Sequence, residues 1–133
     1  MFKPLQYDSG KTMLAPVGST QTIAKGDALV WSSGLLVVAS STTEDVFAVS
    51  LQDAASLTSG TMILVLPVEG IRFEADCDAV ASIADRGTRC DLATVATLNP
   101  DAVLEQVFLI DELVGTEEVT KVVRGTFSRF RAT

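Results

Sequence analysis

Histidine is absent from this chain, and other ingredients of enzyme chemistry are missing with it. Its absence excludes the commonest general base, the usual activator of a serine nucleophile and the commonest zinc ligand. The sequence also has no phosphate-binding loop, no dinucleotide fingerprint and no G-x-S-x-G nucleophile turn. We therefore expect a protein that is not an enzyme, with no catalytic residues, no cofactor and no bound metal.

Long apolar runs are absent as well. The longest, MILVLPV at residues 62–68, is much shorter than the roughly 20 residues that a membrane-spanning helix needs. The start, MFKPLQYDSG, lacks the basic and then apolar pattern of a signal peptide, so we expect a cytosolic product without membrane association. There are only two cysteines, Cys77 and Cys90. A reducing cytosol favours free thiols, while a disulfide stays open if their strands face each other.

Positive charge is scarce. Ten basic residues stand against seventeen acidic ones, and the net charge is −7. Such a surface repels phosphate backbones, so we expect no nucleic-acid partner. Glu74, Asp76 and Asp78 alternate and could hold a cation, but we prefer to interpret them as a solvated strand face. Near the end, Arg129 and Arg131 could pair with an acidic strand of this chain or with an acidic neighbouring subunit.

The sequence contains a succession of short strand signals. Residues 71–75, IRFEA, alternate apolar and charged side chains, and SSG at 32–34 predicts a hairpin turn. The pattern predicts an all-β fold, a compact barrel or sandwich with one or two short helical turns. We expect an extended N-terminal arm over residues 1–16 and a single β-barrel domain over 17–133. In the alternative interpretation, the arm is itself a strand of the barrel.

One short sequence motif occurs twice. IAKGDALV contains Gly26, which lies 21 residues before Phe47, and IADRGTRCDL contains Gly87, which lies 21 residues before Phe108. Each phrase has an isoleucine for the core and a glycine for a tight turn, and each leads to a strand that begins Val-Phe. The repeat predicts two halves of one barrel, each with a similar β-meander. Chance similarity between β sequences is the alternative.

The stretch FAVSLQDAASLTSGTMILVLPVEGIRFEA, residues 47–75, carries Asp53, Ala54, Gly60 and Gly70. Together with the preceding IAKGDALV and the hairpin after it, this stretch resembles the small capsid decoration, or cement, proteins of tailed bacteriophages. The resemblance covers residues 23–75. The sequence departs from the family pattern at residues 50–52, and the C-terminal half has no counterpart in it.

The resemblance implies a β-barrel or β-tulip-like domain that binds the outside of an assembled capsid. The implied partner is the major capsid protein, whose neighbouring copies the domain bridges, and a homo-oligomer on the shell is implied too, with a trimer favoured over a dimer. The place of action is the capsid surface of the virion, assembled in the host cytoplasm. The N-terminal arm then suits strand addition to a capsid edge. The candidate partner-binding residues are Phe2, Lys3, Pro4, Leu5, Tyr7, Arg129 and Arg131.

Two other functions stay open at this point. Head–tail connectors and tail proteins of phages also use small β-barrels, and ring formation in isolation would favour that class. A ligand-binding or enzymatic barrel would need a deep pocket that gathers several acids, such as Glu69, Glu74, Asp76 and Asp78.

Overall fold

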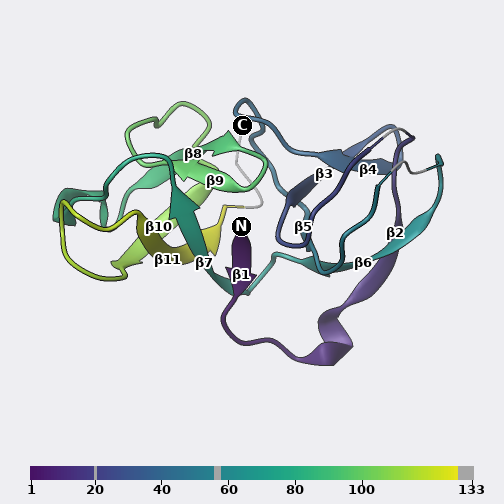
Figure 1. Ribbon diagram of the computed structural model, residues 1–133, viewed down its shortest axis with the longest axis horizontal. Coiled ribbons are helices and arrows are strands. Elements are labelled where there is room, and N and C mark those ends of the chain that lie inside the picture. Colours follow the sequence, from purple (N-terminus) through teal and green to yellow (C-terminus); the bar gives the residue numbers. More distant parts are fainter. Residues whose placement is uncertain (20, 56–57, 129–133) are drawn as a thin grey trace.

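The computed structural model describes residues 1–19, 21–55 and 58–128. These residues form eleven strands and two single turns of 3-10 helix, η1 at Ser9–Lys11 and η2 at Ile83–Asp85. The prediction of an all-β fold with short helical turns is confirmed. Two lobes lie side by side, and the first strand lies between them (Figure 1). Within the described part of the chain, no helix has the length and hydropathy that a membrane crossing requires.

The first lobe is a curled five-stranded sheet, which we call the first barrel (residues 13–68). Its strands are β2 (Met13–Pro16), β3 (Ala28–Ser32), β4 (Leu35–Val38), β5 (Ala48–Ser50) and β6 (Met62–Pro67). The strand order is β2-β6-β5-β3-β4, and a bridge between Val17 and Leu36 joins the two ends of the sheet.

The second lobe is a closed five-stranded barrel, which we call the second barrel (residues 69–128). Its strands are β7 (Arg72–Cys77), β8 (Arg89–Thr94), β9 (Thr97–Asn99), β10 (Phe108–Leu113) and β11 (Val122–Phe127). The order is β7-β11-β10-β8-β9, and a parallel pairing of β9 with β7 closes the ring. A sixth strand, β1 (Phe2–Pro4), pairs with the remaining edge of β7.

The two barrels repeat one backbone framework. The β5–β6 pair joins Ala48 to Pro67, and the β10–β11 pair joins Phe108 to Phe127 sixty residues later. On the other side of β6, Ala15 pairs with Ile63, and sixty residues later Ala75 pairs with Val123. The repeat is therefore real, but its unit is a whole barrel and not half of one. The expectation of a single barrel over residues 17–133 is corrected as well, because the described residues of this range form two barrels.

The repeat also differs by one residue from the alignment that the sequence suggested. The backbone N–H of Phe47 donates to the Leu29 carbonyl, and the N–H of Val107 donates to the Cys90 carbonyl, both at 2.9 Å. Phe47 therefore corresponds to Val107 and not to Phe108. The glycines do correspond: Gly26 and Gly87 have φ of +91° and +82°, and their N–H groups donate to the strands β5 and β10.

The N-terminal residues belong to the sheets, as the alternative interpretation had it, because β1 pairs with β7 and β2 with β6. Phe2 is fully buried in the second barrel, where its ring lies 4.9 Å from that of Phe127. Its N–H donates to the Gly26 carbonyl of the first barrel at 2.9 Å. Outward-facing residues of the first barrel, among them Val49 and Leu66, join the same hydrophobic cluster. The barrels therefore share one core across their junction.

Candidate functional site

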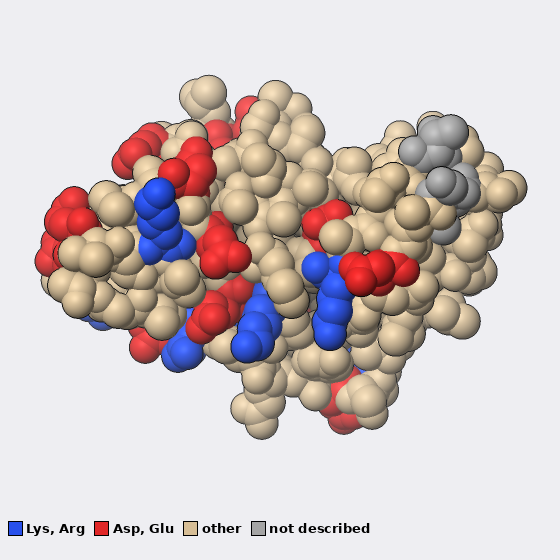
Figure 2. Space-filling view, in the orientation of Figure 1, with Lys and Arg blue, Asp and Glu red and all other residues tan. Residues whose placement is uncertain are grey.

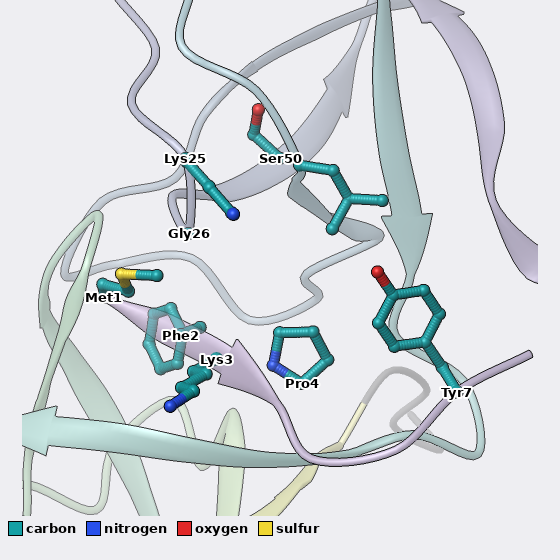
Figure 3. Close-up of a pocket in the computed structure, with 9 residues that line it drawn as sticks. Met1, Phe2, Lys3, Pro4, Tyr7, Lys25, Gly26 and Ser50 are labelled. Atoms are coloured by element: carbon teal, nitrogen blue, oxygen red, sulfur yellow. The ribbon is translucent and has the colours of Figure 1, made fainter. Parts of the chain in front are cut away.

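A pocket of about 230 Å³ opens at the junction of the barrels (Figure 3). Its lining consists of Met1, Phe2, Lys3, Pro4, Tyr7, Lys25, Gly26, Ser50 and Leu51. Lys25 and Tyr7 lie on either side of the space, and Pro4 lies between them (Figure 3). The hydroxyl of Ser50 donates to the Gln52 carbonyl at 2.7 Å. The lining holds ammonium and hydroxyl groups but no carboxylate or thiol, so it suits a small acidic group.

Close packing shapes this pocket. Gly26 has a φ of +91°, which favours glycine, and a Cβ on it would lie 2.6 Å from the Cγ of Met1, so a larger residue would displace the Met1 side chain. The amino group of Met1 donates to Asp76 at 3.0 Å and to the Ala96 carbonyl at 2.8 Å. These bonds join the first residues to the second barrel.

The predicted partner-binding residues differ in how exposed they are. Phe2 is fully buried, so it cannot serve as a surface anchor in this structure. Leu5 and Tyr7 are 37% and 40% exposed, Lys3 is exposed, and Pro4 is half-buried. Arg129 and Arg131 lie outside the described residues.

Acidic residues of β7 and β10 pair with two arginines. Glu74 pairs with Arg124 at 3.2 Å, and Arg124 also pairs with Glu112 at 3.2 Å. Arg72 bonds to Asp111 and to Glu112, and the hydrogen bond to Asp111 is the main cause that raises the pKa of Arg72. In the described part of the chain, no three metal-ligating side chains gather into a cluster. Because these side chains are partly exposed, the network contributes little stability, but it keeps this face solvated.

Charge is divided unequally between the barrels. The first barrel has five charged residues, Lys25, Asp27, Glu44, Asp45 and Asp53, whereas the second barrel has seventeen. On the face that Figure 2 shows, acids and bases are spread over the second lobe and the junction, and most of the first lobe carries none. A surface without charge is costly to leave in water when it also exposes large apolar side chains.

The first barrel does expose such side chains. Leu14 and Met62 are 57% and 52% exposed, while their neighbours along the strands, Ala15 and Ile63, point into the barrel. Leu14 pairs with Leu64, and Met62 pairs with Pro16. We call these four residues the β2–β6 face. Sequence analysis missed it, although the lack of charge over residues 12–24 and 54–68 was its signal.

A second exposed apolar element lies on the second barrel. Leu104 is 82% exposed and Val103 is 53% exposed, at the tip of a loop before β10. The carboxylate of Asp91 is buried and accepts the N–H groups of residues 104, 105 and 106 at 3.2, 2.7 and 2.9 Å. These three bonds hold the loop in one conformation and present Leu104 to solvent.

Both cysteines are buried free thiols, as predicted. Burial, with a further contribution from the charge of Asp78, raises the pKa of Cys77 to about 12. Burial also raises the pKa of Cys90. The thiols are therefore unreactive in the folded protein.

No protein family matches the chain, and no curated protein matches it either. The function must therefore be argued from the surfaces described above.

Proposed function

We propose that this protein binds the outer surface of an assembled phage capsid and stabilises it by bridging neighbouring major capsid subunits. The observation that supports this most is the contrast between the β2–β6 face, which is apolar and without charge, and the acid-rich second barrel. The centre of a stable protein interface is apolar and poor in charge, whereas a surface that stays in water is charged.

The arrangement of the two exposed apolar elements suits bridging. The β2–β6 face belongs to the first barrel and the Leu104 loop to the second, and the shared core holds the barrels together. Two contacts on one rigid body can engage two neighbouring subunits, and each then raises the effective concentration of the other. A protein that binds only the assembled shell stabilises it by mass action. We propose further that several copies associate on the shell, with a trimer favoured.

The test is co-sedimentation of the purified protein with expanded, undecorated capsids of its phage. The informative variant is Leu14→Glu with Leu64→Arg, because it copies onto the first barrel the Glu74–Arg124 pair that the second barrel holds at the corresponding positions. We expect saturable binding by the native protein and binding at least tenfold weaker for this variant. The control is Val119→Lys, which adds a charge at a site that is 70% exposed on the second barrel.

Two results would count against the proposal. The first is no binding by the native protein. If a mass measurement of the free protein then gives a closed ring, a head–tail connector or tail component becomes the better assignment. The second is equal binding by the native protein and the double variant, because the β2–β6 face would then not meet the shell.

A further inference from the structure

The second barrel has one edge that the strand β1 covers. β1 runs antiparallel to β7 and pairs Phe2, Lys3 and Pro4 with Ala75, Glu74 and Phe73. The N–H of Leu5 continues the ladder to the Arg72 carbonyl at 3.0 Å. β9 reaches only the next two residues of β7, Asp76 and Cys77. Residues 73–75 of β7 would therefore be an open edge without β1.

The first barrel has the same edge without a covering strand. Because β7 follows β2 by sixty residues in the repeated framework, residues 13–15 of β2 correspond to residues 73–75. Val17 forms a parallel bridge with Leu36, and the corresponding Cys77 pairs in the same parallel way with Leu98. Within residues 1–19, 21–55 and 58–128, no strand pairs with the free side of residues 13–15. Met13 and Leu14 are 38% and 57% exposed there.

The backbone of Leu14 points to this open edge. The N–H of Val17 donates to the Thr61 carbonyl at 3.0 Å, so Val17 directs its backbone groups toward the neighbouring strand. Because backbone groups alternate in direction along an antiparallel strand, Ala15 and Met13 also direct theirs toward β6. Leu14 must therefore direct its N–H and C=O away from β6, as Glu74 directs its own toward Lys3. An edge with such free groups is a template for another strand.

We propose that residues 13–15 of β2 accept an extended segment of a partner protein as an antiparallel strand, in the place that β1 occupies on β7. This inference deepens the proposed function, because it names the part of the molecule that receives the shell protein. Main-chain hydrogen bonds would supply affinity, and side-chain contacts would supply specificity.

The surroundings define the chemistry of the incoming segment. Lys3 of β1 lies opposite Glu74, but Leu14 stands in the place of Glu74 on the first barrel. Residues 12–24 and 54–68 carry no charge at all, so a charged side chain opposite Leu14 would find no counter-ion among them. The residue opposite Leu14 is therefore apolar, and the partner contributes an extended segment with an apolar side chain at this position.

The test uses a defined probe and needs no capsid. The probe is an acetylated peptide with the sequence of residues 1–6, MFKPLQ, that carries the change Lys3→Val. Nuclear magnetic resonance follows the amide signals of the labelled full-length protein as the peptide is added. We expect shifts at Leu14 and its neighbours on β2. A matched peptide with a methyl group on the backbone nitrogen of its third residue should bind about tenfold more weakly, because it loses the N–H that pairs with the Leu14 carbonyl.

Two variants of the protein complete the test. Leu14→Pro removes the N–H at the open edge, whereas Leu14→Thr keeps it and suits an exposed strand. We expect the threonine variant to bind the peptide and the proline variant to bind it at least tenfold more weakly, with the remaining amide spectrum of both unchanged. If the proline variant does not fold, the methylated peptide alone decides.

Several outcomes would overturn the inference. They are no binding at millimolar peptide, shifts away from β2, and equal binding of the methylated peptide. Signals of residues 13–15 that broaden with protein concentration alone would show that a second copy, and not a foreign segment, takes the edge. If the protein binds the peptide but not the capsid, the open edge of β2 is supported and the proposed function is refuted. If the native and Leu14→Pro proteins bind the capsid equally, the proposed function is supported and the role of the open edge is refuted.

Discussion

Replacing Phe2 with alanine tests whether the first strand is part of the fold or a detachable arm. Phe2 is fully buried, and its ring lies 4.9 Å from Phe127 and 6.1 Å from Phe108. Truncating a buried phenylalanine removes its transfer free energy and leaves a cavity, at a cost of about 3–5 kcal/mol. For a protein of this length, that loss lowers the melting temperature by about 11–18 °C.

The matched control is Leu5→Ala, three residues further along. Leu5 is 37% exposed, so its truncation should lower the free energy of unfolding by less than about 1 kcal/mol. Urea unfolding of the three proteins gives the comparison, because a shift of the midpoint at constant slope reports stability alone. The reasoning is refuted if Phe2→Ala unfolds at the same urea concentration as Leu5→Ala. β1 would then be a dispensable arm.

Three further predictions concern single features of the second barrel. Asp91→Ala leaves three N–H groups without their acceptor, so we expect a loss of about 3 kcal/mol and faster hydrogen exchange at residues 104–106. Gly125→Ala places a Cβ against the Leu109 carbonyl and 2.9 Å from the Phe108 ring, and urea unfolding should show a loss of at least about 2 kcal/mol. Burial raises the pKa of Cys77 from about 9 in the unfolded chain to about 12 in the folded protein, so the free energy of unfolding should fall as the pH rises through that interval. Cys77→Val, which copies Val17 of the first barrel, should show a smaller fall.

Local patterns in the sequence predicted the fold class well. The alternation at residues 71–75 gives a strand because a two-residue period can bury one face only in an extended chain. The doubled glycine phrase marks a real correspondence, since Gly26 and Gly87 both adopt positive φ before an equivalent strand. The size of the repeat could not be read in this way, because β2 and β7 share their pairing but little of their sequence. Strand order depends on contacts far apart in the chain.

The candidate surfaces were harder to predict for a physical reason. A buried residue such as Phe2 and an exposed one such as Leu14 look alike in a list of apolar residues, and only the register tells them apart. Phe2 was expected at an interface, but successive side chains of β1 point to opposite faces, and that of Phe2 points into the second barrel. Leu14 was not singled out, yet its place between Met13 and Ala15 turns it to the outside. A shift of register by one residue would exchange the two faces of a strand.

One position of the repeated framework carries the strongest argument for an interface. In the second barrel it holds the Glu74–Arg124 pair, and in the first barrel it holds Leu14 opposite Leu64. The backbone is the same in both places, so the fold itself requires neither pair. A leucine pair whose Leu14 is exposed gains little in water and invites aggregation, whereas the ion pair keeps the surface soluble. The leucines become favourable once another surface covers them, since each Å² of apolar area then removed from water contributes about 25 cal/mol. This contrast supports the proposal that the β2–β6 face meets a partner, whereas the corresponding face of the second barrel, with its Glu74–Arg124 pair, remains in water.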